Sequence, residues 1–294
     1  QKLAAVLKIE PKLLAFGNGS NELIRILAQI IVAPGEEIVM ATPSFIYYPI
    51  AAQIVQAKAV QIPLDKNYRH NLEAMAKAVT KKTKLVFVCN PNNPTGTVVS
   101  AAALKAFLEQ LPPEVVVAVD EAYHEYVDDP SYQTALNFLK EHPNLVVLRT
   151  FSKIFGLAGT RIGYLAANEE IVAAVNKVRE PFNVNLVAQV GAYFSLDELS
   201  EIAKRRQLTL NYKKYLYKKL EQMGVNFVPS QTNFIYFKTA RKGRELFQDW
   251  QKQGVIVRPV ALDGSFLRVT VGTAAENEKF LKLVERHLDE VKTE

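Results

Sequence analysis

The sequence predicts an α/β protein: a mostly parallel sheet lies between two layers of helices, and a smaller α+β domain follows at the C-terminus. The chain has 294 residues, 49% of them hydrophobic, which is enough material for one large domain or two ordinary ones. Helical patterns alternate with short apolar runs in the first half, as in proteins built from βα units, and after about Asn185 this alternation stops. The composition excludes disordered, collagen-like and disulfide-stabilised proteins.

The alternation can be followed element by element along the first part. Each expected helix carries apolar residues at helical spacing, and each expected strand is a short run rich in Val, Ile and Leu. The first helix is expected to begin after Gly19 and Ser20. In chain order we expect a helix at 21–32, a strand at 37–40, a helix at 45–56, a strand at 59–62, a helix at 72–79, a buried strand at 85–89, a helix at 100–110, and strands at 115–119 and 145–149.

The C-terminal part has a different pattern. A long amphipathic helical region extends to Met223, and its basic stretch between Lys204 and Lys219 is expected to be a solvated helix face with an apolar stripe on the core. Short strands are expected near 234–237, 255–257 and 267–271, and a closing helix begins at about Ala275. We therefore predict a large domain at 1–190 and a small domain at 191–294.

Charge and cysteine content restrict the cellular setting and the partners. The formal charge of +6 is compatible with nucleic acid, anionic lipid or phosphorylated small molecules, and does not choose among them. The single cysteine, Cys89, cannot form an internal disulfide, and no leader-like segment stands at the start, so we expect a reducing, cytoplasmic setting. The most apolar stretch, residues 38–60, is interrupted by Pro and Gln, so we expect no membrane span.

Polar segments follow three of the expected strands. Residues 90–96 (Asn-Pro-Asn-Asn-Pro-Thr-Gly) follow the strand at 85–89, residues 120–123 (Asp-Glu-Ala-Tyr) follow 115–119, and residues 150–153 (Thr-Phe-Ser-Lys) follow 145–149. Arg161 stands eight residues after the lysine, and residues 17–22 (Gly-Asn-Gly-Ser-Asn-Glu) precede the first helix. Taken singly, these segments are typical of turns, caps and surface charges. Together they lie where open α/β sheets bind ligands, at the carboxyl ends of their strands.

In order and spacing, this set resembles the fold-type I aminotransferases that use pyridoxal 5'-phosphate, and within them most closely the histidinol-phosphate aminotransferase family, over nearly the whole chain. The resemblance implies that Lys153 binds the cofactor aldehyde covalently and moves a proton, and that Asp120 pairs with the pyridine nitrogen. It also implies that Tyr123 and Asn93 hydrogen-bond the phenolic oxygen. Phe45 matches the position that stacks on the cofactor ring, although an ordinary core Phe remains a plausible alternative.

The resemblance also implies two anion sites. Ser20, Asn21 and Glu22 open a helix whose free N–H groups favour an anion, here the cofactor phosphate. Substrate contacts are implied for the second domain, where Arg268 takes the anionic end of the substrate and Arg258, whose alternative is a surface ion pair, assists. The remaining residues that the resemblance assigns are Thr150, Ser152 and Arg161 at the cofactor phosphate and Asn233 on the substrate side.

The expected activity is therefore the interconversion of histidinol phosphate and 2-oxoglutarate with imidazole-acetol phosphate and glutamate, as part of histidine biosynthesis. We expect a homodimer that binds small molecules, with no metal, nucleic acid or membrane partner. Members of the family usually carry an N-terminal arm, whose tyrosine reaches the partner's cofactor phosphate; the chain as given lacks this arm, and the loops 197–200 and 261–265 look short.

Three alternatives remain open. An aromatic-amino-acid aminotransferase is the nearest, because Phe45, Tyr47 and Tyr48 could line an aromatic pocket. A threonine-phosphate decarboxylase shares the same motifs. The cofactor-sensing domain of a transcription regulator is a more distant alternative, because no helix-turn-helix precedes the domain in this chain.

Overall fold

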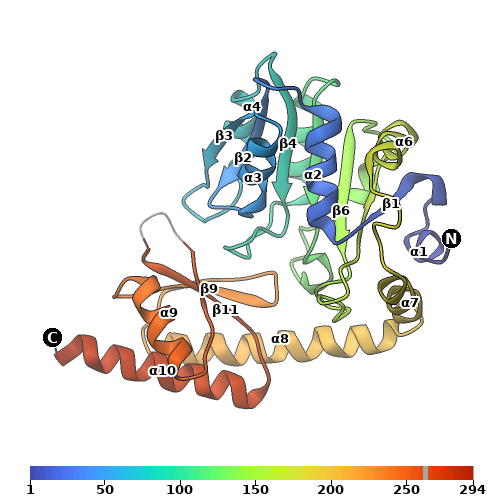
Figure 1. Cartoon of the computed structure of the whole chain (residues 1–294). Helices are drawn as coiled ribbons and strands as arrows, with labels where there is room; N and C mark the ends of the chain where they lie inside the picture. The colour runs from blue at the N-terminus through green and yellow to red at the C-terminus, as the bar shows by residue number, and fades with distance from the viewer. Residues whose placement is uncertain (261–263, 294) are drawn as a thin grey trace.

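The computed structural model describes residues 1–260 and 264–293, arranged as two sheets with their covering helices (Figure 1). The strands are β1 (Leu14–Gly17), β2 (Glu37–Thr42), β3 (Lys58–Pro63), β4 (Thr83–Cys89), β5 (Val116–Asp120), β6 (Leu145–Thr150), β7 (Gly163–Ala166), β8 (Phe227–Val228), β9 (Phe234–Lys238), β10 (Arg258–Pro259) and β11 (Phe266–Thr270). The α-helices are α1 (Lys2–Leu7), α2 (Ser20–Ile31), α3 (Tyr47–Ile54), α4 (Leu72–Lys77), α5 (Ala101–Gln110), α6 (Glu169–Val178), α7 (Leu186–Ser195), α8 (Leu199–Gln222), α9 (Gly243–Lys252) and α10 (Ala274–Thr293). Three short 3₁₀ helices complete the described elements: η1 (Pro11–Leu13), η2 (His124–Tyr126) and η3 (Ala135–Phe138).

The large sheet has seven strands in the order β1-β7-β6-β5-β4-β2-β3. All neighbours from β3 to β6 pair in parallel, and β7 runs antiparallel to both β6 and β1. The chain order reverses between β2 and β4, because β2 continues outward to β3 while β4 continues to β5 and β6. This connectivity confirms the predicted α/β class with a mostly parallel sheet.

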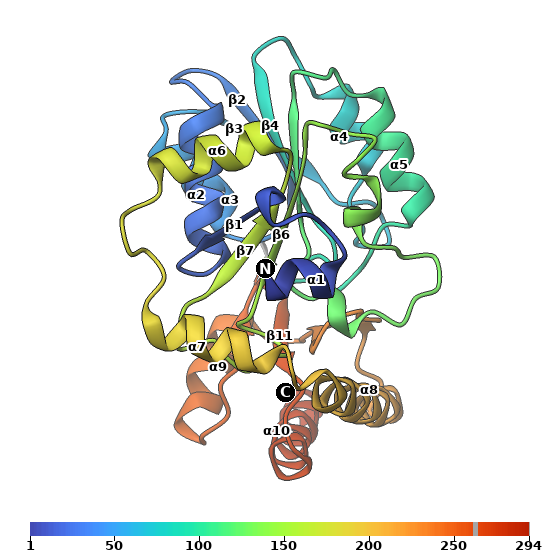
Figure 2. The ribbon, with the colours of Figure 1, turned by 90° about the vertical axis from the view of Figure 1, so that its right-hand side faces the viewer.

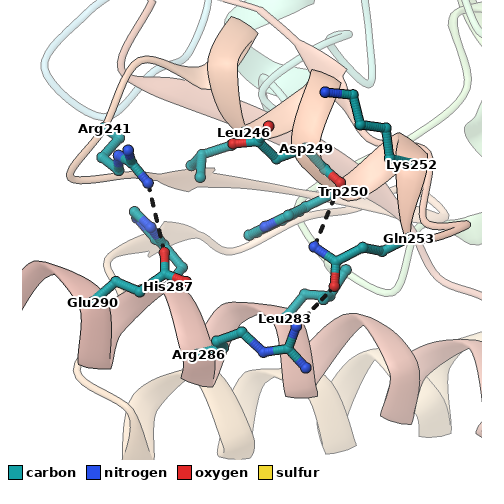
Figure 3. A pocket seen from close by; sticks show the side chains of 10 residues that line it. All are labelled: Arg241, Leu246, Asp249, Trp250, Lys252, Gln253, Leu283, Arg286, His287 and Glu290. Carbon is teal, nitrogen blue, oxygen red and sulfur yellow. Dashed lines mark hydrogen bonds and ion pairs between the residues drawn. The ribbon is translucent and has the colours of Figure 1, made fainter.

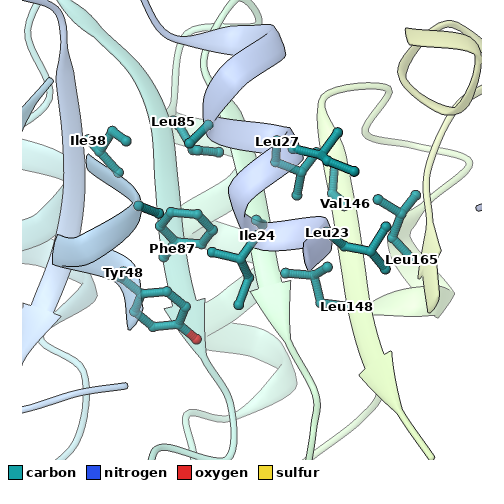
Figure 4. Packing of buried hydrophobic residues seen from close by; sticks show 14 of the residues in the cluster. Leu23, Ile24, Leu27, Ile38, Tyr48, Leu85, Phe87, Val146, Leu148 and Leu165 are labelled. Atoms are coloured by element: carbon teal, nitrogen blue, oxygen red, sulfur yellow. The ribbon is translucent and has the colours of Figure 1, made fainter. Parts of the chain in front are cut away.

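Helices cover both faces of the large sheet, which gives three layers (Figure 2). Helices α2, α3 and α6 lie on one face, where Leu23, Ile24 and Leu27 of α2 pack on Phe87 of β4 and on neighbouring strands (Figure 4). Helices α4 and α5 lie on the other face, where Phe107 packs among strand residues. Burial on both faces is the reason that the central strands read as unbroken apolar runs.

The small sheet is antiparallel, with the order β10-β11-β9-β8. Its strands alternate between two environments, as expected of a sheet with two different faces. Ile235 and Phe237 of β9 and Leu267 and Val269 of β11 pack in a core that also includes residues of α8, α9 and α10. The other residues of these strands point away from this core, and Phe234 packs instead with Tyr123 of the large sheet's loops.

Several elements depart from the expectations. The long helical region before Met223 consists of two helices, α7 and α8. The short strand expected near 255–257 lies slightly later, at Arg258 and Pro259, which pair with β11. Val257 packs in the small core. Elements that were not expected are α1, β1, α6, β7, β8, α9 and the three 3₁₀ helices. Helix α6 had a visible start signal, because the side chain of Asn168 caps the N–H of Ile171 at 2.8 Å.

The connection between the two parts runs through α7 and α8. Ala188 and Ala192 of α7 pack with Phe151 and Tyr164 beside the large sheet, whereas Leu216 of α8 packs in the small core. The boundary at 190 stays a prediction. Three of the residues of the loop 261–265 lie outside the described residues, and residues 196–198 join α7 to α8. Among the helices described, none has the length and apolar character needed to cross a membrane.

The packing of α2 predicts where the large domain is vulnerable. Leu27 is fully buried against the sheet, so Leu27→Ala should lower the free energy of unfolding by about 2–5 kcal/mol through lost burial and a residual cavity. Gln29→Ala in the same helix is the control, because Gln29 is exposed and its loss should cost within about 0.5 kcal/mol. Urea unfolding of both variants measures the difference, and equal losses would contradict the assigned core.

Candidate active site

The carboxyl ends of β4, β5 and β6 lie side by side at one edge of the large sheet. Cys89, the last residue of β4, is in register with Asp120, the last residue of β5, and Asp120 is in register with Leu148 near the end of β6. The segments 90–96, 120–123 and 150–153 therefore leave the sheet at the same edge, close to the reversal of chain order between β2 and β4. Open α/β sheets bind their ligands at such a reversal.

Asp120 is a buried carboxylate at the centre of this edge, with 3% of its surface exposed. Tyr48 donates its hydroxyl to Oδ2 at 3.0 Å, and the backbone N–H of Ala122 donates to Oδ1 at 3.1 Å. Burial raises the pKa of Asp120 to about 6, although the hydrogen bond from Tyr48 and the charge of Lys153 act in the opposite direction. A carboxylate in this position is stabilised by any cation that binds against it, such as a protonated ring nitrogen.

Lys153 and Tyr123 lie near one another beside this carboxylate. The Nζ atom of Lys153 is 5.1 Å from the centre of the Tyr123 ring. Tyr123 is buried, and its ring meets that of Phe234 edge to face at 5.1 Å between centroids. The sequence predicted Lys153 and Tyr123 together, and the structure brings them together with Asp120.

An anion cradle lies at the N-terminus of α2. Gly19 precedes the helix with φ 75°, and a Cβ atom there would be 2.2 Å from Nη2 of Arg161, so the guanidinium lies directly against the backbone at the start of the helix. Arg161 also donates to Oγ of Ser152 at 3.4 Å, and Thr150 Oγ1 accepts from the N–H of Ser152 at 3.0 Å. The free N–H groups that begin at Ser20 and the cation of Arg161 form a site that fits a phosphate group.

Glu22 lies in the same turn of α2 but is engaged by protein groups. Its Oε2 atom accepts hydrogen bonds from the N–H of Asn18 and from Nδ2 of Asn183, both at 2.7 Å. These bonds hold the loop before α2 in place. The carboxylate of Glu22 therefore stabilises the loop that forms the anion cradle. A direct contact between Glu22 and the cofactor stays a prediction.

Arg268 of β11 connects the small sheet to the loop after β4. Its Nη1 donates to Oδ1 of Asn93 at 2.5 Å, and its guanidinium carbon lies 4.6 Å from the centre of the Phe234 ring. The Nε atom of Arg268 is buried and has no hydrogen-bond partner among residues 1–260 and 264–293. An arginine with a buried, unpaired donor beside a cluster of catalytic-type residues is suited to receive an anionic ligand.

Three other predicted residues, Arg258, Asn233 and Phe45, lie around the cluster of Asp120, Lys153, Tyr123 and Arg268. Arg258 is in register with Arg268 on the neighbouring strand, and it is exposed. Asn233 is half-buried at the start of β9, where its carbonyl accepts the N–H of Val271 at 2.8 Å. Phe45 is half-buried and meets Tyr48 edge to face at 5.5 Å, so it lies one side chain away from Asp120.

The sequence analysis missed the groups that support the site. The sequence suggests Tyr48 only for the aromatic pocket of an alternative activity, whereas in the structure Tyr48 stacks on Phe87 at 4.5 Å and donates to Asp120. Glu121 and Arg149 form a buried ion pair at 2.8 Å; although burial opposes it, the charge of Arg149 keeps the pKa of Glu121 below its usual value. The only signal for this pair was its position, because the two residues adjoin Asp120 and Thr150.

The cavities described in the structure lie elsewhere. One, of about 530 Å³, lies between α9 and α10, and the ion pair of Arg241 with Glu290 crosses it, as does the hydrogen bond from Arg286 to Gln253 (Figure 3). A larger cavity of about 970 Å³ is lined by residues of α1, β1 and α7 and by Phe151. Neither includes Asp120 or Lys153 in its lining, so the candidate site rests on the convergence of its side chains.

Comparison with known proteins agrees with this geometry. The family model for aminotransferase class I and II matches residues 1–284. A histidinol-phosphate aminotransferase of Moorella thermoacetica is 47% identical over 285 residues, which cover 96% of this chain and 74% of the relative. One of Caldicellulosiruptor saccharolyticus is 41% identical and covers 98% of this chain and 80% of the relative.

Solved structures share the fold. A putative histidinol-phosphate aminotransferase of Erwinia carotovora atroseptica superimposes with a TM-score of 0.93 at 24% identity, covering 99% of this chain and 85% of the other. The enzyme of Sinorhizobium meliloti, solved in complex with pyridoxal 5'-phosphate, also has a TM-score of 0.93 at 24% identity, covering 99% and 80%. With the family model and the relatives above 40% identity, these findings show that the chain belongs to the class I and II aminotransferases and, within them, to the histidinol-phosphate aminotransferase family.

Proposed function

We propose that this protein is a pyridoxal-5'-phosphate-dependent aminotransferase that interconverts histidinol phosphate and 2-oxoglutarate with imidazole-acetol phosphate and glutamate, in histidine biosynthesis. The observation that carries the proposal is the convergence of the buried Asp120, Lys153 and the anion cradle at one edge of the sheet. We take the substrates from relatives that are named histidinol-phosphate aminotransferase and are 39–47% identical to this chain. A cytoplasmic setting, which the single buried Cys89 favours, is part of the proposal.

The residues of the site fit the cofactor group by group. Ser20, Asn21, Thr150, Ser152 and Arg161 would hold its phosphate, since they surround the start of α2. When bound, pyridoxal 5'-phosphate supplies an electron sink for the carbanion formed when the substrate α-carbon loses a proton.

The protein's own groups provide the charges and the protons. Asp120 would hold the proton on the ring nitrogen, because its buried carboxylate is stabilised by a cation. Lys153 would hold the aldehyde covalently until the substrate amine displaces it, and its freed Nζ atom would then carry the proton. Tyr123 and Asn93 would donate to the phenolic oxygen. Because Oδ1 of Asn93 accepts from Arg268, its Nδ2 is left as the donor for this bond.

Arg268 would bind the anionic end of the substrate. Its planar fork suits both a carboxylate and a phosphate, so a single residue can serve glutamate and histidinol phosphate. Arg258, in register with it, would add a second positive charge for the dianionic phosphate. Asn233 follows the turn at residues 230–232 and would contact the substrate from the same side.

We also propose that the working unit is a homodimer, because α7 presents an apolar stripe to solvent. The stripe follows helical spacing on the face opposite to the buried Ala188 and Ala192. Phe182, just before α7, is 97% exposed, and Val187 is 71% exposed. Exposed apolar surface of this extent is typical of subunit interfaces. The exposed residues of the stripe are Leu186, Val187, Val190, Tyr193 and Phe194.

The raised pKa of Asp120 predicts a pH-dependent effect in the cofactor-free protein. The folded state holds a proton on Asp120 up to about pH 6, whereas the unfolded chain loses it near 3.8, so this group makes the protein less stable as pH rises between these values. Asp120→Asn removes this effect and should stabilise the cofactor-free protein more at pH 8 than at pH 5, by about 1 kcal/mol. Turnover of the loaded enzyme should fall by about 10²-fold or more.

Urea unfolding at both pH values measures the stability effect, and Asp249→Asn, an exposed carboxylate of α9, is the control. If Asp120→Asn raised the free energy of unfolding by the same amount at pH 5 and at pH 8, the pKa of Asp120 would not be raised in the folded protein.

The proposed activity is tested by single half-reactions that follow the cofactor absorbance. Histidinol phosphate and glutamate should react fastest in a panel that also holds phenylalanine, tyrosine and threonine phosphate. Lys153→Ala should bind the cofactor without turnover, and borohydride reduction of the unsubstituted protein should label Lys153. Faster reaction with phenylalanine or tyrosine would indicate an aromatic-amino-acid aminotransferase, and release of carbon dioxide from threonine phosphate would indicate a decarboxylase.

The dimer proposal predicts the effect of a charge on the α7 stripe. Sedimentation should show about twice the chain mass for the protein, and Val187→Glu should shift it toward the monomer because it buries a charge in the interface. Leu208→Glu is the control, since Leu208 is exposed on α8, away from this stripe. A dimer that survives Val187→Glu unchanged would place the interface on another surface.

A further inference from the structure

Lys213 of α8 is a buried cation that the proposed chemistry does not use. Only 3% of its surface is exposed, and no carboxylate in the described part of the chain lies within ion-pair distance of its Nζ atom. Burial lowers the pKa of Lys213 to about 8, and the charge of Asp128 opposes this while those of Arg206 and Lys214 add to it. A buried ammonium is costly unless its donors are satisfied, so Lys213 needs hydrogen-bond acceptors around its Nζ atom.

The donors of Lys213 are directed at one turn. Its Nζ atom donates to the carbonyl of Ser230 at 2.6 Å and to that of Thr232 at 3.3 Å. Tyr217, one helical turn further along α8, accepts the N–H of Ser230 at 2.6 Å. Within the turn, the hydroxyls of Ser230 and Thr232 are 2.7 Å apart. The turn at residues 230–232 is therefore fixed to α8 by a cation and a tyrosine.

The opposite side of this turn rests on the large domain's loops. The N–H of Gln231 donates to the carbonyl of Gly96 at 2.6 Å. A Cβ atom on Gly96 would be 2.2 Å from Oγ of Ser230, so only glycine permits this approach, and the φ of 76° also favours glycine. Oε1 of Gln231 accepts the N–H groups of Asp128 and Asp129 at 2.8 and 3.1 Å.

The turn thus lies between the residues that would contact the cofactor and those that would contact the substrate. Gly96 belongs to the segment that carries Asn93, and the turn continues directly into Asn233 and Phe234. Phe234 in turn packs between Tyr123 and Arg268. A displacement of this turn would change the position of Asn233 and Arg268 relative to Asn93 and Tyr123.

We propose that Lys213 is a positioning residue: by holding the carbonyls of Ser230 and Thr232, it sets how the substrate-binding strands of the small sheet meet the loop of Asn93. This inference rests on the proposed aminotransferase function for its kinetic consequence. The structural part of the inference, that Lys213 holds the turn against Gly96, does not depend on the proposed function. Lys213 acts through the turn and has no contact with the reacting groups.

The test compares Lys213→Met with Lys214→Met, which removes the exposed neighbouring lysine of the same helix. Methionine has a similar length and no donor, so it leaves both carbonyls without their partner. Lys213→Met should raise KM for the amino substrate by about tenfold, the loss expected for a charge-assisted hydrogen bond, with a smaller change in kcat. Lys213→Arg, which keeps a donating cation, should recover most of this loss, and Lys214→Met should leave both constants unchanged.

A second measurement does not need the loaded enzyme. In the cofactor-free protein, hydrogen exchange should accelerate in peptides covering 230–233 and 91–97 for Lys213→Met, and not for Lys214→Met. A variant that loses only thermal stability, with unchanged KM and unchanged exchange at 91–97, would overturn the proposal.

If Lys213→Met fails to fold, Gln231→Ala provides a second test, because it weakens the same turn from its other side. Gln231→Ala should also raise KM, and an unchanged KM in this variant would overturn the proposal. Absence of transamination in the unsubstituted protein would reject the proposed function, while the exchange result would still decide the role of Lys213.

Discussion

The parallel pairing of β4, β5 and β6 is the constraint on which the candidate site depends. It brings three strand ends to one edge, so that Cys89, Asp120 and the residues after Leu148 become neighbours although they are far apart in the sequence. Burial of the strands on both faces places Asp120 in a poorly solvated position, which raises its pKa and creates the demand for a cationic partner. The position of the charge therefore follows from the topology of the sheet.

The same edge is reinforced by a second, fully buried pair. Glu121 accepts two hydrogen bonds from Arg149, at 2.9 and 2.8 Å from Nε and Nη2, and its other oxygen accepts the N–H of Ala135 at 2.6 Å. These bonds join the segment after β5 to the end of β6, which carry Tyr123 and Lys153 respectively. Removing one member of such a pair costs about 3–5 kcal/mol because a buried charge is left alone. The ion pair holds together the two segments for which we propose a catalytic role, and we assign it no part in the chemistry.

The sequence predicted strands correctly where a local pattern of residues determines the local structure. The apolar runs at 85–89 and 145–149 predict β4 and β6 because strands buried on both faces carry few polar residues, and the segments that follow them predict the site residues. Contacts between distant segments could not be predicted in this way. Tyr48 and Asp120 are 72 positions apart, and Arg268 and Asn93 are 175 apart, so only the assembled sheets bring them together. Similarly, Lys213 lies in a basic stretch that resembles a solvated face, and its burial depends on the turn at 230–232.

Arg268 shows how one side chain can serve two partners in the proposed reaction. A guanidinium has five N–H donors in a rigid plane; Nη1 of Arg268 donates to Asn93, while Nε is buried and has no partner in the described part of the chain. An anion can therefore bind at the remaining donors without breaking the contact with Asn93. That contact occupies Oδ1 of Asn93, which leaves Nδ2 as the end of the amide that would donate to the cofactor in the proposed reaction. Because the two contacts share one planar group, a change that rotates Arg268 would alter the proposed substrate binding and the proposed hydrogen bond to the phenolic oxygen together, and this coupling is the reason we assign a positioning role to the turn at 230–232.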